Sequence, residues 1–147
     1  MALLAKLCSL SALERRELLL ALVLLPTVDV ALRTGGLRLV QKTFGLESYS
    51  GEHSSRSSLD AGQLARLVAA AARRGPYRGS CMVRSLTLQW LLKRHGLEGR
   101  LRLGVRKTGN RLEAHAWIEH EGKPLIDPAN VSGDFAPFDP ISTDSRT

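Results

Sequence analysis

Three side chains in this sequence have the types and the order that acyl-transfer chemistry requires: Cys81, His115 and Asp127. In that chemistry an imidazole removes the proton of a thiol, and the thiolate attacks a carbonyl carbon to form a thioester that water hydrolyses. An aspartate orients the imidazole ring and stabilises its cation. We therefore interpret Cys81 as a nucleophile, His115 as its base and Asp127 as the orienting acid.

The position of Cys81 at the start of a predicted helix supports this interpretation. Ser80 is a favourable N-cap, and the apolar residues that follow predict a helix that runs to about His95. In the first turn of a helix, unpaired backbone N–H groups and the helix dipole stabilise a thiolate, and Arg78 and Arg84 add positive charge nearby. A lone cysteine also occurs as an inert buried side chain, so the position at the helix start does not by itself distinguish a reactive thiol from an inert one.

The same chemistry requires an oxyanion hole made by the backbone N–H of Cys81 and one further donor. Gln63 is taken as that donor, with Gln89 and Ser80 as alternatives between which the sequence does not choose. Three further residues are expected to contact the substrate or to support the three reacting side chains: Trp117, Arg84 and Ser80.

Two segments after the helix predict an antiparallel hairpin. Residues 100–106 and 112–119 alternate apolar and polar side chains, with a turn at 107–110 between them. In the second segment His115 and Trp117 share one face, and Ala116 and Ile118 share the other. The chain is therefore expected to be α+β, with the helix that bears the cysteine packed on a small antiparallel sheet.

The next turn sets the predicted register of His115 and Asp127. We take His120-Glu121-Gly122 as a three-residue loop, because such loops commonly end in a left-handed residue that glycine tolerates best. This loop pairs His115 with Asp127 on the following strand, and directly opposed residues share a face. A two-residue loop would shift the register by one and place the two side chains on opposite faces.

The first part of the chain is expected to be a helical region, residues 1–46. A capping box at Ser11 opens a leucine-rich helix, which Pro26 is expected to break or kink and Gly35-Gly36 to interrupt. A serine-rich linker at 47–58 then leads to a peptidase core at 59–147, which begins with a helix capped by Asp60.

Composition excludes several other classes of protein. Residues 56–106 hold eleven basic side chains against two acidic ones, yet only seven aromatic residues occur in the chain and no nucleic-acid-binding motif is present, so we expect no nucleic-acid partner. Two cysteines and no CxxC pair indicate neither a disulfide scaffold nor a metal site, and no cofactor is expected. The uncharged run 18–28 is too short to span a membrane, no cleavable signal peptide is evident, and a reducing cytoplasm is expected.

The residues around the proposed catalytic side chains resemble a known family, the transglutaminase-like cysteine peptidases of lasso-peptide biosynthesis. These are leader peptidases related to the microcin J25 maturation protein. Four stretches carry the resemblance, which covers about residues 60–128: Cys81–Leu92, Leu103–Arg106, Ala114–Glu119 and Gly122–Asp127.

The resemblance implies a metal-free, papain-like fold in which the cysteine lies on a central helix against an antiparallel sheet. It assigns the catalytic triad to Cys81, His115 and Asp127. It further implies cleavage of a ribosomally made precursor after its leader, which frees the core peptide for a separate cyclase.

The leucine-rich segment 1–46 does not resemble the small β-rich leader-binding domain that some members carry. We therefore expect the split type, which needs a separate leader-binding protein docked on the helical region or on the basic face. Two alternatives remain open: an acyl transferase of the same fold, in which an amine resolves the thioester, and a non-catalytic peptide-binding module.

Overall fold

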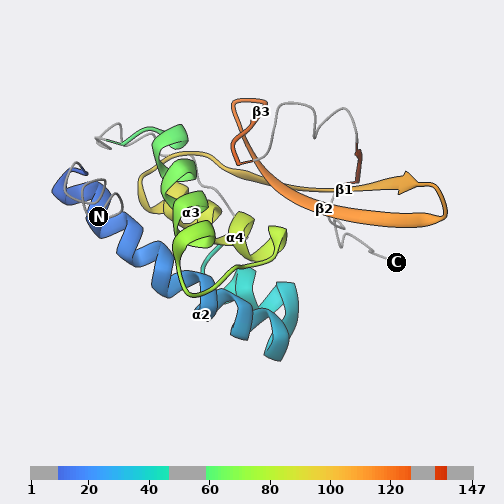
Figure 1. The fold of residues 1–147 in the computed structure, drawn as a ribbon, viewed down its shortest axis with the longest axis horizontal. Helices are drawn as coiled ribbons and strands as arrows, with labels where there is room; N and C mark the ends of the chain where they lie inside the picture. The colour runs from blue at the N-terminus through green and yellow to red at the C-terminus, as the bar shows by residue number, and fades with distance from the viewer. Residues whose placement is uncertain (1–9, 47–58, 127–134, 139–147) are drawn as a thin grey trace, which may run out of the picture.

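The computed structural model of this protein describes residues 10–46, 59–126 and 135–138 (Figure 1). The described elements follow one another in this order: α2 (Ala12–Thr43), α3 (Ala61–Arg74), α4 (Cys81–Arg94), β1 (Arg100–Thr108), β2 (Arg111–His120), β3 (Lys123–Pro124) and β4 (Ala136–Phe138). The strands form one antiparallel sheet in the order β3-β2-β1-β4. The helices gather at one end of the β1–β2 hairpin, which confirms the α+β class.

Helix α2 begins where the sequence predicts. The Ser11 hydroxyl accepts a hydrogen bond from the backbone N–H of Glu14, and the Glu14 carboxylate accepts one from the backbone N–H of Ser11. Of the predicted break or kink at Pro26, the break is wrong, because α2 continues through Pro26 to Thr43. A proline forfeits one helical hydrogen bond, and buried packing of Leu25 and Val28 on either side holds the helix together.

The interruption lies instead at the second expected position, Gly36. This residue has φ 69° and ψ −174°, which bends the chain within the helical segment. Only glycine adopts such angles without steric cost.

Helix α4 is the centre of the fold, since it contacts α2, α3, β1 and β2. Residues from most of its circumference are buried: Val83, Ser85, Leu86, Thr87, Leu88, Leu91 and Leu92. Its core also takes in side chains of α2, such as Leu25 and Val40. The helical region therefore shares one hydrophobic core with the rest of the described chain. The proposed linker at 47–58 lies outside the described residues.

The β1–β2 hairpin confirms the predicted alternation. Leu101 pairs with Ile118, and both belong to the core beneath the helices. Gly104 pairs with His115, and each is three residues from Leu101 or Ile118 on its own strand. Successive residues of a strand face opposite sides of the sheet, so this odd spacing places Gly104 and His115 on the opposite face. His115 and Trp117 therefore lie on the face that α4 does not cover.

The turn between β2 and β3 differs from the prediction. His120 pairs with Lys123, and Glu119 pairs with Pro124, so the loop is the two-residue turn Glu121-Gly122. Both loop residues have positive φ, 50° and 75°, which is typical of the type I′ turns that match the twist of hairpins. The predicted three-residue loop was therefore wrong, and the register argument that paired His115 with Asp127 no longer holds. Asp127 itself lies outside the described residues.

Helix α2 is long and apolar enough to cross a membrane, judged by length and composition alone. The uncharged run 18–28 is too short to span a membrane by itself, but α2 extends beyond it in both directions, from Ala12 to Thr43. Core helices of soluble proteins and signal sequences near the N-terminus pass the same test. In this structure the inner face of α2 packs on α3 and α4, so the helix is part of the folded domain.

Candidate active site

Cys81 occupies the first residue of α4, as predicted. The hydroxyl of the N-cap Ser80 accepts a hydrogen bond from the N–H of Val83 at 3.3 Å, and the Ser80 carbonyl accepts one from the N–H of Arg84 at 3.0 Å. The N–H groups of Cys81 and Met82 have no acceptor in the helix and point beyond its start. The thiol is free and partly buried, so it is accessible at the positive end of a helix.

The segment that leads into Cys81 is fastened to α2. Tyr77 hydrogen-bonds to the Asp29 carboxylate, which also pairs with Arg33 at 2.7 Å. The Tyr77 hydroxyl lowers the pKa of Asp29, and the Asp29 carboxylate in turn raises the pKa of Tyr77. Closer to the thiol, a Cβ on Gly79 would lie 2.9 Å from Val83 Cγ1, so only glycine fits this approach.

A buried hydrogen bond joins α4 to the strand that bears His115. Ser85, one helical turn after Cys81, donates its hydroxyl to the carbonyl of Ala116 at 3.0 Å. The N–H of Leu125, in the segment after β3, donates to the carbonyl of Ile118. Carbonyls two residues apart on a strand point to the same side, so the carbonyl of Ala116 also points towards the β3 side of β2. Ser85 therefore satisfies a strand carbonyl beside His115 and fixes the first turns of α4 against β2.

His115 lies in a group of aromatic side chains on the outer face of the sheet. Its ring stacks near Trp117, with 6.2 Å between ring centroids and an interplanar angle of 18°, and lies 5.3 Å from the Phe135 ring. Opposite His115, a Cβ on Gly104 would lie 3.0 Å from the Trp117 indole. The missing side chain of Gly104 thus leaves the space that the indole fills.

Trp117, which was predicted to contact the substrate or to support the reacting side chains, is fully buried within this face. Its indole N–H donates to one oxygen of Glu119 at 3.2 Å, and Arg102 donates to the other at 3.0 Å.

Cys81 and His115 lie on neighbouring elements, but the structure does not join their side chains. Within the described ranges there is no hydrogen bond between the thiol and the imidazole, and the imidazole lies on the sheet face away from the α4 core. The third residue of the predicted triad, Asp127, is outside those ranges. The geometry therefore fixes the surroundings of the nucleophile and of the histidine separately.

The candidates for the second oxyanion donor have other bonds. The Gln63 side-chain oxygen accepts from the N–H of Asp60 at 2.8 Å in the cap of α3, at the end of that helix remote in sequence from Cys81. The Gln89 amide donates to the carbonyl of Gly99 at 3.1 Å. The Ser80 hydroxyl accepts from Val83, so its own proton remains available to a ligand. Arg84 is partly buried, and its Nε has no partner among the described residues.

Sequence reasoning missed Ser85 and the pair Tyr77–Asp29. The spacing of four residues between Cys81 and Ser85 places both on one side of the helix, which was an available signal. The partners, Ala116 and Asp29, are distant in sequence and left no such signal. In the described part of the chain, no group of three or more His, Cys, Asp or Glu side chains is arranged to hold a metal ion.

Comparison with known protein families gives a match over most of the chain. Residues 24–141 match the family described as the transglutaminase-like superfamily, a span that includes Cys81, His115 and Asp127. No curated protein and no solved structure matches the chain significantly. Members of this superfamily are generally cysteine peptidases or acyl transferases. By this match the chain belongs to the transglutaminase-like superfamily.

Proposed function

We propose that this protein is a cysteine peptidase that uses Cys81 as nucleophile, His115 as general base and Asp127 as the residue that orients the imidazole. The main support is the placement of Cys81 at the capped start of α4, which the Ser85–Ala116 hydrogen bond ties to the strand of His115. A thiol at a helix start gains nucleophilicity from the dipole and the free N–H groups.

The reaction follows from these roles. The imidazole takes the thiol proton, and the sulfur attacks the scissile carbonyl carbon, whose oxygen becomes an oxyanion. The peptide C–N bond then breaks, the imidazolium gives its proton to the leaving amine, and a thioester remains on Cys81. Water, deprotonated by the imidazole, hydrolyses the thioester and restores the thiol.

The Cys81 N–H is one oxyanion donor, and Ser80 is the better placed of the predicted second donors because its hydroxyl proton is available beside Cys81. The side-chain N–H groups of Gln63 are also candidate donors to the oxyanion, but Gln63 lies in the first turn of α3, at the end of that helix more distant in sequence from Cys81.

The mechanism requires the thiol and the imidazole to approach to hydrogen-bond distance when substrate binds, since catalytic contacts often tighten only in the complex.

The substrate that we propose is the leader region of a lasso-peptide precursor, as the sequence resemblance implies. The protein would act in the cytoplasm with a separate leader-binding protein, and it would hand the freed core peptide to a cyclase. Mixing the chain, that leader-binding protein and the precursor should release leader and core peptide, as measured by mass spectrometry. Formation of a new amide in place of hydrolysis would indicate an acyl transferase, and an uncleaved precursor would contradict both.

A specific observation favours one alternative, the non-catalytic peptide-binding module. The imidazole of His115 contacts Trp117 and Phe135 on the face away from α4, and a binding module would not need it to reach the thiol. Alkylation of the protein with iodoacetamide separates the two proposals. A peptidase should lose precursor cleavage in step with modification of Cys81, whereas a binding module should retain precursor binding and show no cleavage in either state.

A further inference from the structure

The outer face of α2 carries exposed apolar side chains in a regular row. Leu19, Val23 and Val30 are 63%, 65% and 59% exposed, although large aliphatic side chains are usually buried. At 3.6 residues per turn these three positions fall within an arc of about 40° on the helix. We call these three residues the outer stripe. Only 17% of the most apolar 18-residue stretch of α2 is buried in the domain.

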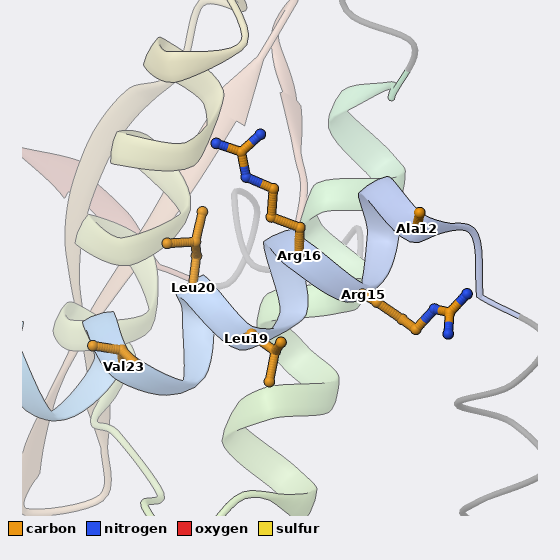
Figure 2. A pocket seen from close by; sticks show the side chains of 6 residues that line it. All are labelled: Ala12, Arg15, Arg16, Leu19, Leu20 and Val23. Carbon is orange, nitrogen blue, oxygen red and sulfur yellow. The ribbon is translucent and has the colours of Figure 1, made fainter.

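A shallow apolar groove lies along the first half of the outer stripe. Among the described residues its lining comes from α2: Ala12, Arg15, Arg16, Leu19, Leu20 and Val23. Figure 2 shows the guanidinium groups of Arg15 and Arg16 extending from the helix in different directions near one end of the groove. Neither arginine makes an ion pair within the described residues, so this end of the groove carries uncompensated positive charge.

The spacing along this face matches the seam of a coiled coil. Positions 12, 16, 19, 23, 26 and 30 alternate steps of four and three residues, which is the spacing of a and d positions in heptads. Ala12, Leu19, Val23 and Val30 are the aliphatic members of this row, whereas Arg16 and Pro26 occupy its other two positions. A strict a/d row is the narrow seam that a partner helix covers. We propose that the outer stripe docks an amphipathic helix of another protein, whose apolar a and d residues cover Leu19, Val23 and Val30 and whose carboxylates face Arg15 and Arg16.

A membrane surface fits this face less well than a helix does. Helices that lie in a bilayer interface present a broad apolar face, often with aromatic anchors. Here the outer stripe is narrow, the exposed Thr27 and Arg33 flank it, and α2 contains no tryptophan, tyrosine or phenylalanine. On its other side α2 carries Glu17, which is 1% exposed and lies 3.5 Å from His95 of the domain.

A second copy of this chain also fits less well. Parallel packing of two stripes would bring Arg15 and Arg16 against the same residues of the other copy, where like charges repel. Antiparallel packing over positions 12–30 would place them near Pro26 and Thr27, which offer no carboxylate. Asp29, the nearest acidic residue, is already bonded to Arg33 and Tyr77. The proposal is independent of the peptidase function.

Two synthetic peptides of about 21 residues test the proposal on the full chain. Both carry leucine at a and d positions; one carries glutamate at the flanking e and g positions, and the other carries lysine. We expect the acidic peptide to bind with a Kd on the order of 10 µM in calorimetry and the lysine peptide at least about tenfold more weakly. Val23→Asp should weaken binding of the acidic peptide at least about tenfold. The double variant R15E with R16E should bind the lysine peptide more tightly than the acidic one. Leu112→Asp, at the far end of the hairpin, is the matched control and should change nothing.

Four results would overturn the proposal. The first is no binding of the acidic peptide up to about 100 µM. The second is equal binding of both peptides with no effect of the arginine reversals. The third is binding to phosphatidylcholine–phosphatidylglycerol vesicles that Val23→Asp abolishes, which would assign the face to a membrane. The fourth is a dimer in sedimentation equilibrium that Val23→Asp dissociates, which would assign it to a second copy. Circular dichroism melting of each variant shows that the exposed substitutions leave the fold intact.

Discussion

Helices α2 and α4 are both rich in leucine, but only α4 is buried around most of its circumference. The α4 residues Leu88, Leu91 and Leu92 are fully buried, whereas Leu19 and Val23 of α2 are more than 60% exposed. The difference comes from position: α4 packs against two helices and two strands, whereas α2 packs mainly against α3 and α4 among the described elements. Apolar content therefore did not determine burial. The covered helix presents the candidate nucleophile, and the half-covered helix presents a surface for another molecule.

The largest expected effect comes from removing a core side chain of α4. Leu91→Ala should lower the free energy of unfolding by about 3 kcal/mol, because it removes a buried side chain and leaves a cavity. The matched control Leu19→Ala, on the exposed face of α2, should change it by less than about 0.5 kcal/mol. Urea denaturation measures both. Equal losses in the free energy of unfolding would mean that the outer face of α2 is covered in solution, and the two helices would then not differ in burial.

The contact between the two helices should have the next largest effect. Glu17 of α2 is 1% exposed and lies 3.5 Å from His95, which caps the end of α4. His95→Ala should destabilise the fold by about 2 kcal/mol, because it leaves a buried acidic group without its neighbour. Arg33→Ala, which breaks the exposed pair with Asp29 on the same helix, should have little effect on the unfolding curve. If the arginine variant were the less stable one, burial would not be what distinguishes the two pairs.

The bond between α4 and β2 should affect both stability and activity. Ser85→Ala leaves the buried Ala116 carbonyl without its donor and should cost about 1–2 kcal/mol. If the bond positions Cys81 beside β2, kcat for precursor cleavage should also fall about tenfold at a temperature where the variant is folded, with little change in KM. Ser80→Ala, which removes the N-cap, should cost about 1 kcal/mol. An unchanged kcat in the Ser85 variant would reduce this bond to a purely structural role.

The smallest effect is expected where α2 holds the segment before Cys81. The Tyr77 hydroxyl lowers the pKa of Asp29, so Tyr77→Phe should raise that pKa towards the ordinary aspartate value of about 3.9. An NMR titration of the Asp29 carboxyl carbon measures the change. A group with a lowered folded-state pKa contributes stability above its unfolded pKa and loses it as the pH falls through the folded value. The contribution of Asp29 is therefore complete at neutral pH and is lost only in acid. An unchanged titration curve would mean that Tyr77 does not hold this carboxylate.

The local features of this fold were readable from the sequence. The caps Ser11, Asp60 and Ser80 and the alternation in β1 and β2 depend on neighbouring residues, and the structure confirms them. The failures have a different origin. Tertiary packing on both sides of Pro26 outweighed the loss of one hydrogen bond, and Glu121 adopted a left-handed conformation that its side chain does not predict.

The candidate site was predicted less completely than the fold. Helix capping located Cys81, and periodicity located the face of His115. The Ser85–Ala116 bond joins residues 31 positions apart, which no local pattern reveals. The pairing of His115 with Asp127 depended on a loop length that proved to be one residue too long, so the role of Asp127 rests on the resemblance and stays a prediction.

The role of Cys81 as nucleophile is tested most directly by comparing the two cysteines of the chain. Precursor cleavage is measured by mass spectrometry with the leader-binding protein present, for the unmodified chain and for Cys81→Ala and Cys8→Ala. We predict that Cys81→Ala lowers the cleavage rate by at least about 1,000-fold, because no other group replaces the thiolate, and that Cys8→Ala cleaves normally. Cleavage at an undiminished rate by the Cys81→Ala variant would contradict the account.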